Sequence, residues 1–168
     1  MPRVFIALGS NIAGELDCPT SQVKHALQAI DKLAKTKIIK QSSLYKTSPI
    51  GYINQPDFIN AVAEIVTEFT PQHLLEQLLE IEQAFGRERP FANAPRVLDL
   101  DILLYDDLIC DTKTLTLPHP RMHIRAFVLI PLAEIAPDLS IPNHGNVVKL
   151  AAELLNQGIE KLDEFLTE

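Results

Sequence analysis

The chain has 168 residues, of which 46% are hydrophobic and 22% are charged, and its formal net charge is −7. This composition is typical of a soluble globular protein, and the length fits a single domain, residues 1–168. The negative charge disfavours sequence-independent nucleic-acid binding, and no apolar run is long enough to span a membrane. Cys18 and Cys110 are too few for a disulfide framework, and the apolar N-terminus is too short for a signal peptide. We therefore expect a cytoplasmic protein that binds neither nucleic acid nor membranes.

The first third of the chain predicts a strand, a helix and a second strand. Residues 3–8 are apolar, and a turn signal at residues 9–11 follows them. This turn matches neither GxxxxGK[ST] nor GxGxxG, so it is either a tight turn or a loop that lines a ligand site. Helical spacing of apolar residues predicts a helix that opens at residue 19, and residues 37–46 predict the second strand.

A long connection leads to a third predicted strand. Residues 47–56 are rich in Pro, Gly and Asn and are too long for a hairpin turn, and such connections are often functional. Residues 58–67 then alternate, which places Phe58 and Asn60 on one face. Asn60 beside an aromatic residue either pairs with a flat heterocycle or caps a strand end.

The second predicted helix begins at Thr70-Pro71, an N-cap followed by a first-turn proline, and ends at Gly86. Glu82 lies on its apolar face, where it either reaches out to solvent or points toward a ligand. A second long connection with two prolines, residues 87–95, follows.

The most informative segment is residues 96–105, which predict a strand that ends at an Asp106-Asp107 turn. Side chains alternate along a strand, so Asp99 and Asp101 share one face. Two adjacent carboxylates repel each other and lose solvation unless a cation lies between them. Magnesium suits such a pair, because it binds carboxylate and phosphate oxygens. The alternative is a solvent-facing strand that carries two charges.

The arginines cluster around this segment. Five of the six lie between residues 87 and 125, although the protein is acidic overall. The planar guanidinium group is suited to phosphate, so the pattern predicts a polyphosphate site with its metal. These residues are Arg87, Arg89, Arg96, Arg121 and Arg125.

The C-terminal part predicts two short strands, at residues 108–110 and 115–117, then a basic loop. His119 and His123 have the spacing of zinc ligands on a helix, but Pro120 disfavours a helix there and no HExxH motif is present. Residues 126–135 predict a helix that is interrupted near Pro131, and an amphipathic helix closes the chain.

The order of these elements, βαββαβ, predicts an α+β fold: a ferredoxin-like sandwich with a C-terminal helical extension. In this arrangement the central sheet is antiparallel and the helices cover one face. We expect the other face to be free for ligands and for the two long loops.

Several segments together resemble the 6-hydroxymethyl-7,8-dihydropterin pyrophosphokinase family of folate biosynthesis. The resemblance spans roughly residues 3 to 140. It rests on Gly9-Ser10-Asn11, Thr47-Ser48-Pro49-Ile50-Gly51, Gln55-Pro56-Asp57-Phe58-Ile59-Asn60, Glu82 with Gly86-Arg87, Pro95-Arg96-Val97-Leu98-Asp99-Leu100-Asp101-Ile102-Leu103, Leu117-Pro118-His119-Pro120-Arg121-Met122 and Arg125-Ala126-Phe127.

This resemblance implies transfer of pyrophosphate from ATP to the pterin hydroxymethyl group, which releases AMP, in a single pterin pyrophosphokinase domain. It implies that Asp99 and Asp101 hold two Mg²⁺ ions. It further implies a catalytic set, a pterin set and an ATP set. The catalytic set is Arg87, Arg89, Arg96, Asp99 and Asp101; the pterin set is Thr47, Ser48, Pro49, Ile50, Phe58, Asn60 and Phe127; the ATP set is Glu82, Arg89, Arg96, Ile102, Thr116, His119 and Arg125.

The sequence departs from the family pattern at a few positions. Asn93-Ala94 stands where members often have Trp-Gly, Thr114 where some have an arginine, and Pro120 where some have tyrosine. Two other functions remain as alternatives: a ferredoxin-like binding module for RNA or a small molecule, and a magnesium-dependent nucleotidyl transferase. We expect the protein to be a monomer.

Overall fold

A six-stranded antiparallel sheet forms the centre of the computed structural model, which describes residues 2–10, 19–47, 58–85 and 98–162. The strands follow the order β10-β3-β4-β1-β5, and β2 pairs with the second half of β4 beyond β3. Their bounds are β1 (Arg3–Ser10), β2 (Thr36–Gln41), β3 (Tyr45–Thr47), β4 (Phe58–Thr67), β5 (Asp99–Tyr105) and β10 (Ile159–Lys161).

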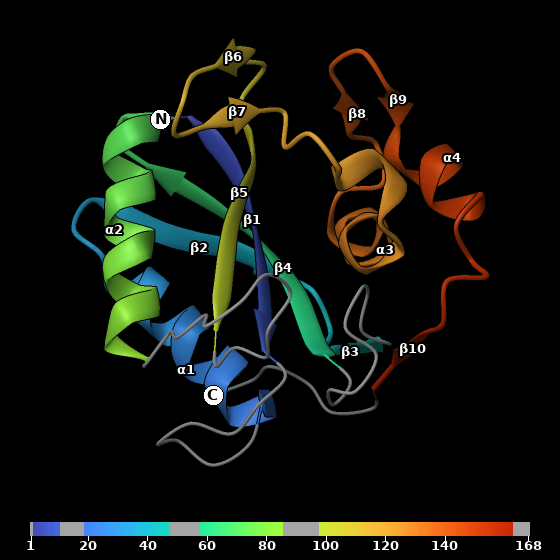
Figure 1. Ribbon diagram of the computed structural model, residues 1–168, viewed down its shortest axis with the longest axis horizontal. Coiled ribbons are helices and arrows are strands. Elements are labelled where there is room, and N and C mark those ends of the chain that lie inside the picture. Colours follow the sequence, from blue (N-terminus) through green and yellow to red (C-terminus); the bar gives the residue numbers. More distant parts are fainter. Residues whose placement is uncertain (1, 11–18, 48–57, 86–97, 163–168) are drawn as a thin grey trace.

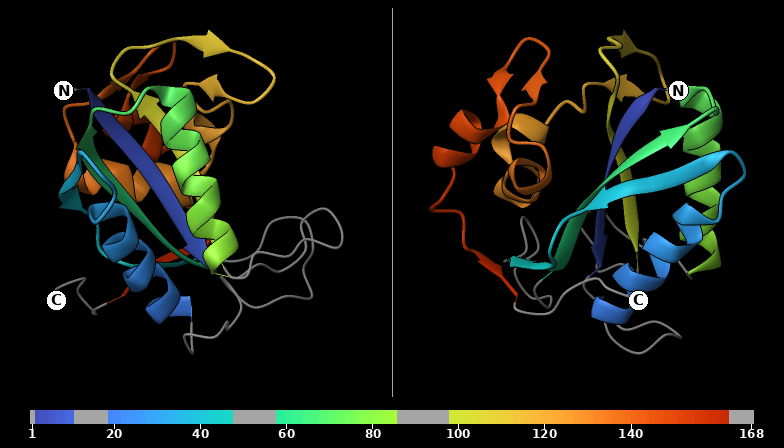
Figure 2. Two further views of the ribbon diagram at one scale, coloured as in Figure 1. Left: turned by 90° about the vertical axis from the view of Figure 1, so that its left-hand side faces the viewer. Right: turned by 180° about the vertical axis from the view of Figure 1, so that it is seen from behind.

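Two helices cover one face of the sheet. These are α1 (Pro19–Asp31) and α2 (Pro71–Ala84), which lie on the left of the sheet in Figure 1 and in front of it on the left of Figure 2. Their apolar side chains pack with Ile6, Ala63 and Ile102 in one core. The start of α2 is as predicted: Thr70 is the N-cap, and its hydroxyl accepts a hydrogen bond from the backbone N–H of His73 at 3.2 Å.

The expectation of a free second face is wrong. Helix α3 (Ala126–Ile135) lies against it, and the short α4 (Val147–Ala152) packs on α3, both on the right in Figure 1. The physical reason is that this face carries Phe5, Val62 and Leu103, which form a second core with α3. Because α3 is apolar nearly all round, it is stable only where neighbours surround it. The part of this face that remains for ligands is at the end of the sheet where β1 finishes and β5 begins.

One side chain of β5 faces the opposite way from the prediction. Strict alternation places Leu104 with Ile102 on the α1–α2 side. Instead the register shifts, so that Ile102 lies opposite Ile6 and Leu104 lies opposite Phe5. The extra residue, Leu103, forms a bulge, and both Leu103 and Leu104 pack into the α3 core.

The C-terminal part differs most from the prediction. Helix α3 continues through Pro131 without interruption. The closing helix is reduced to the six residues of α4, and β10 then joins the edge of the main sheet. The remaining elements are β6 (Cys110–Asp111), β7 (Thr116–Leu117), the 3₁₀ helix η1 (Met122–Ile124), β8 (Ser140–Ile141) and β9 (Gly145–Asn146). Among the described helices, none is both long and apolar enough to cross a bilayer.

Candidate active site

The site is built on one row of residues that crosses three strands. Asp99 on β5 lies opposite Gly9 on β1, and Gly9 lies opposite Asn60 on β4. Directly opposite residues of antiparallel strands have their side chains on the same face. Since glycine has no side chain, the row places a carboxylate and an amide on either side of an open position.

The amide of Asn60 is held in one orientation. Its Oδ1 accepts a hydrogen bond from the hydroxyl of Thr47 on β3 at 2.7 Å, and both side chains are buried. Its Nδ2 lies over Gly9, at 2.9 Å from the position that a Cβ atom would take there. With Oδ1 accepting from Thr47, the N–H₂ group is the end of the amide that lies over Gly9. Gly9 thus makes room for Asn60, a role that the turn signal alone did not reveal.

The two aspartates share a face, as predicted. Asp101 lies opposite Ala7 on β1, and Ala7 packs against the α3 core, so the carboxylates of Asp99 and Asp101 are on the α3 side of β5. Both residues are partly exposed. Within the described ranges, no group of three or more His, Cys, Asp and Glu residues could hold a metal ion. The two carboxylates would therefore share a hard cation with water or with substrate oxygens, which is the usual way that Mg²⁺ binds next to phosphates.

His119 lies next to the carboxylates. Its backbone N–H donates to the carbonyl oxygen of Leu103 on β5 at 2.9 Å. Burial lowers the pKa of its imidazole to about 4, and the positive charges of Arg125 and Arg121 act in the same direction, although Asp99 opposes them. The ring is therefore neutral at pH 7. Its Nδ1 accepts from the backbone N–H of Arg121 at 3.2 Å, which leaves Nε2 as the protonated donor.

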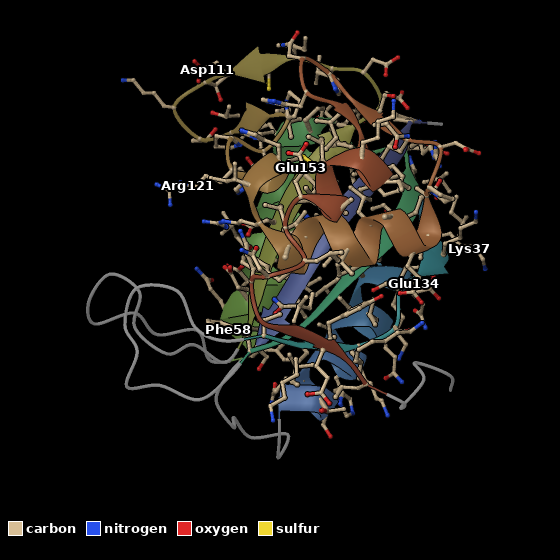
Figure 3. The ribbon with its side chains drawn as sticks, turned by 90° about the vertical axis from the view of Figure 1, so that its right-hand side faces the viewer. Lys37, Phe58, Asp111, Arg121, Glu134 and Glu153 are labelled. Atoms are coloured by element: carbon tan, nitrogen blue, oxygen red, sulfur yellow. The ribbon has the colours of Figure 1, made fainter. Side chains whose placement is uncertain are left out.

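Arg125 and Phe127 extend the site along the start of α3. The guanidinium carbon of Arg125 lies 5.4 Å from the centre of the Phe127 ring, a cation–π contact. Phe127 packs against the α3 core. Phe58 lies on the same side of the sheet, because it is two residues before Asn60 on β4 and side chains two residues apart share a face. Figure 3 shows Phe58 at the end of the sheet below Arg121. The structure therefore brings the basic residues, the carboxylates and both aromatic residues to one face.

Of the residues expected at the adenosine, Glu82 and Ile102 lie on the α1–α2 side of β5, away from Asp99 and Asp101, and Thr116 is on β7. Glu82 on α2 is buried, and its Oε2 accepts from the backbone N–H of Leu100 at 2.6 Å. Ile102 is buried in the α1–α2 core, and Thr116 on β7 donates to Asp111 at 3.2 Å. Because β5 is an edge strand, Glu82 satisfies one of its outward backbone donors. The sequence left open whether Glu82 faces solvent, and the structure answers that it does not.

Six of the expected site residues lie outside the described residues. Five of them come from the two long connections, and the sixth, Arg96, opens the segment predicted as the aspartate strand; they are Ser48, Pro49, Ile50, Arg87, Arg89 and Arg96.

The profile of the family described as 7,8-dihydro-6-hydroxymethylpterin-pyrophosphokinase (HPPK) matches residues 5–137. The chain belongs to the HPPK family. It is 44% identical to the 2-amino-4-hydroxy-6-hydroxymethyldihydropteridine pyrophosphokinase of Haemophilus influenzae, over 97% of this chain and 99% of that protein. The enzyme of the same name from Pseudomonas aeruginosa is 43% identical over 95% of this chain and 96% of its own length.

Solved structures support the fold of this HPPK chain. A crystal structure of HPPK-DHPS in complex with substrates has a TM-score of 0.76 at 13% identity, and the match covers 96% of this chain and 48% of that one. A Plasmodium falciparum HPPK-DHPS structure has a TM-score of 0.71 at 16% identity, with 90% and 44% covered. The chain thus spans less than half of those two-part proteins. The pyrophosphokinase reaction on hydroxymethyldihydropterin in folate synthesis is the activity of the family to which this chain belongs.

Proposed function

We propose that this chain transfers pyrophosphate from ATP to 6-hydroxymethyl-7,8-dihydropterin at the end of the sheet where Asp99, Gly9 and Asn60 form one row. The observation that carries this proposal is the row itself, because it places β5, with its pair of partly exposed carboxylates, and the buried amide of Asn60 on β4 on either side of the single strand β1. Such an arrangement suits a phosphorylated substrate on one side and a flat polar ring on the other. The products are AMP and the pterin diphosphate.

Asp99 and Asp101 fit a magnesium site. Both contribute hard oxygen atoms from the same strand face and are partly exposed, so a cation there could also bind substrate oxygens. We propose two Mg²⁺ ions, which would neutralise the triphosphate and lower the pKa of the pterin hydroxyl. The task of the two aspartates is to place that charge between the two substrates, because phosphoryl-type transfer depends mainly on positioning and charge neutralisation.

The pterin slot is proposed between Phe58 and Phe127, with Asn60 at the ring edge. The hydrogen bond from Thr47 supports this, because it leaves the Asn60 N–H₂ group to donate to an acceptor on the ring. Stacking on aromatic faces suits a flat heterocycle. From the neighbouring connection, Ser48, Pro49 and Ile50 would complete the slot.

The phosphates are assigned to the basic residues. Asp99 and Arg125 both lie close enough to His119 for their charges to act on its imidazole, and the neutral His119 would donate through Nε2 to a phosphate oxygen. A neutral donor there avoids adding a third positive charge between Arg121 and Arg125. We assign Arg87, Arg89 and Arg96 to the same phosphates from the sequence, and Glu82, Ile102 and Thr116 to the adenosine.

When the short strand β3 is left aside, the elements from β1 to β5 follow the order βαββαβ, and their strand order β5-β1-β4-β2 supports a ferredoxin-like topology. We further propose that residues 1–168 form one domain, and that the enzyme is monomeric and works in the cytoplasm without nucleic-acid or membrane partners.

Manganese binding tests the central assignment. With a non-hydrolysable ATP analogue present, electron paramagnetic resonance of Mn²⁺ should show tight binding to the wild type. Asp99→Asn and Asp101→Asn should each weaken it at least tenfold, because each removes one charged ligand. An Asp106→Asn variant, in the exposed turn beyond β5, is the matched control. If the β5 variants bind Mn²⁺ as the wild type and the control do, the metal assignment is wrong.

A further inference from the structure

The side chain of Gln157 bonds to the backbone on both sides of Arg125. Its Oε1 accepts from the N–H of Ala126 at 2.9 Å, and its Nε2 donates to the carbonyl oxygen of Ile124 at 3.1 Å. These partners are 31 and 33 residues earlier in the chain. One amide thus holds the two peptide groups that flank a single residue.

That residue joins η1 to α3. Arg125 has an extended backbone (φ −116°, ψ 115°) between the two helices, and it has no side-chain cap of its own at the start of α3. The first N–H groups of a helix lack partners within the helix, so another group must satisfy them. Gln157 supplies this partner for Ala126 and, through Ile124, also fixes the residue before Arg125. Gln157 thus helps to fix the backbone from which the Arg125 side chain leaves, together with hydrogen bonds from the N–H of Arg125 to Met122 and from Val128 and Leu129 to the carbonyl oxygen of Arg125.

The segment that follows Gln157 also contacts β3, which carries Thr47. After Gln157, β10 pairs with β3, with Ile159 opposite Thr47, and the N–H of Leu162 donates to Leu44 at 2.9 Å. Figure 1 shows β10 beside β3, and Figure 3 shows the chain passing the start of α3 on its way there. Thr47 in turn orients Asn60. Residues 157–162 thus contact both the backbone around Arg125 and the strand that carries Thr47.

Glu134 connects α3 with β10 and with the segment that leads into β3. Its carboxylate accepts from the hydroxyls of Ser43 at 2.7 Å and Tyr45 at 2.8 Å, and lies 3.6 Å from the ammonium group of Lys161 on β10. Burial raises the pKa of Glu134, but these hydrogen bonds and Lys161 outweigh it and hold the pKa below its usual value. An ionised Glu134 keeps β3, β10 and α3 in a fixed arrangement, so the stretch around Gln157 is firmly docked.

We propose that Gln157 is a positioning residue for substrate binding, which acts by fixing the backbone on both sides of Arg125 and so aiming Arg125 and Phe127 into the site. The inference rests on the proposed roles of those two residues. Gln157 lies outside residues 5–137, the part of the chain that the HPPK profile matches. A segment beyond the matched region is therefore part of the active-site framework.

The test compares Gln157→Met with the wild type in the full-length enzyme. Methionine keeps the length of the side chain and removes both hydrogen bonds. The Michaelis constant for ATP and the dissociation constant for the pterin should rise roughly threefold to tenfold, as expected for one modest hydrogen-bonding interaction, with a smaller change in kcat. Asn156→Ala, at the exposed neighbouring position, is the control and should leave both constants unchanged.

A double-mutant cycle with Arg125→Ala separates positioning from simple stabilisation. If Gln157 acts through Arg125, the effect of Gln157→Met on the ATP constant should largely disappear when Arg125 is already alanine. An equal effect in both backgrounds, or a lower Tm with unchanged substrate constants, would overturn the inference while Arg125 keeps its proposed role. If Arg125→Ala itself changes neither constant, the proposed phosphate assignment fails first, and the inference fails with it.

Discussion

Substituting Gly9 with alanine tests the arrangement of the pterin side most sharply. A Cβ atom at this position would lie 2.9 Å from Nδ2 of Asn60, well inside ordinary van der Waals contact. The amide cannot simply withdraw, because Thr47 holds its other end at 2.7 Å. Overpacking of this kind costs about 1–3 kcal/mol, and loss of the Thr47 hydrogen bond would add about 1 kcal/mol. We expect Gly9→Ala to lower the stability of the enzyme by about 2–4 kcal/mol if both effects occur.

The same change should weaken pterin binding by about tenfold, since displacement of the Asn60 amide removes roughly 1.4 kcal/mol of interaction. ATP binding should change much less, because Asn60 belongs to the residues proposed for the pterin and not to those proposed for ATP. Isothermal titration with the pterin, in the presence of a non-hydrolysable ATP analogue, measures the first effect, and titration with the analogue alone measures the second.

The matched comparison is Gly9→Ala in an Asn60→Ala background. There the added methyl group has no amide to displace, so its effects on stability and pterin affinity should mostly vanish. If Gly9→Ala keeps wild-type pterin affinity and Tm, or if it weakens ATP binding equally, the proposed packing of Asn60 over Gly9 is wrong.

Three further predictions concern the aromatic pair, Glu82 and His119. Phe58→Ala and Phe127→Ala should each weaken pterin binding by about 1 kcal/mol or more and ATP binding much less; equal losses for both ligands in titrations would mark the two rings as core residues. Glu82→Ala should lower stability by about 1–3 kcal/mol, because it leaves the buried N–H of Leu100 without its acceptor; Glu82→Gln should restore most of the Tm, and a Tm unchanged in both variants would refute this role. His119 should titrate near pH 4 by NMR in the metal-free enzyme. Because this pKa lies below its ordinary value of 6.5, the unfolded chain binds a proton that the folded chain does not, so stability should fall as the pH drops from about 6.5 to about 4. A His119→Gln variant with an unchanged loss of stability in that window would contradict the assignment.

The strands at the centre of the site could be predicted from the sequence because their patterns are local. Alternation along residues 58–67 places Phe58 and Asn60 on one face, and alternation at Asp99 and Asp101 places both carboxylates on one face of their strand. Thr70 and Pro71 likewise indicate the start of a helix, because a threonine side chain can cap a helix and proline fits its first position. Such features depend on neighbours within a few residues, and the structure confirms them.

The remaining features depend on contacts between distant residues. The bulge at Leu103 arises from pairing with β1, and no property of the leucine run indicates it. The second core under α3 is an exception. The residues of α3 are apolar nearly all round, and such a helix is stable only when neighbouring elements bury it, so the sequence does indicate a second core. The bonds from Gln157 to the peptides around Arg125 carry no sequence signal, since a single glutamine in a polar segment usually contacts water.

The measurement that tests the account most directly is the nucleotide product formed from MgATP with and without 6-hydroxymethyl-7,8-dihydropterin. The account predicts AMP, in equal amount to the pterin diphosphate, only when the pterin and Mg²⁺ are both present. It also predicts that Asp99→Asn and Asp101→Asn abolish this product while remaining folded. Formation of ADP, formation of AMP without the pterin, or near wild-type turnover by either aspartate variant would contradict it.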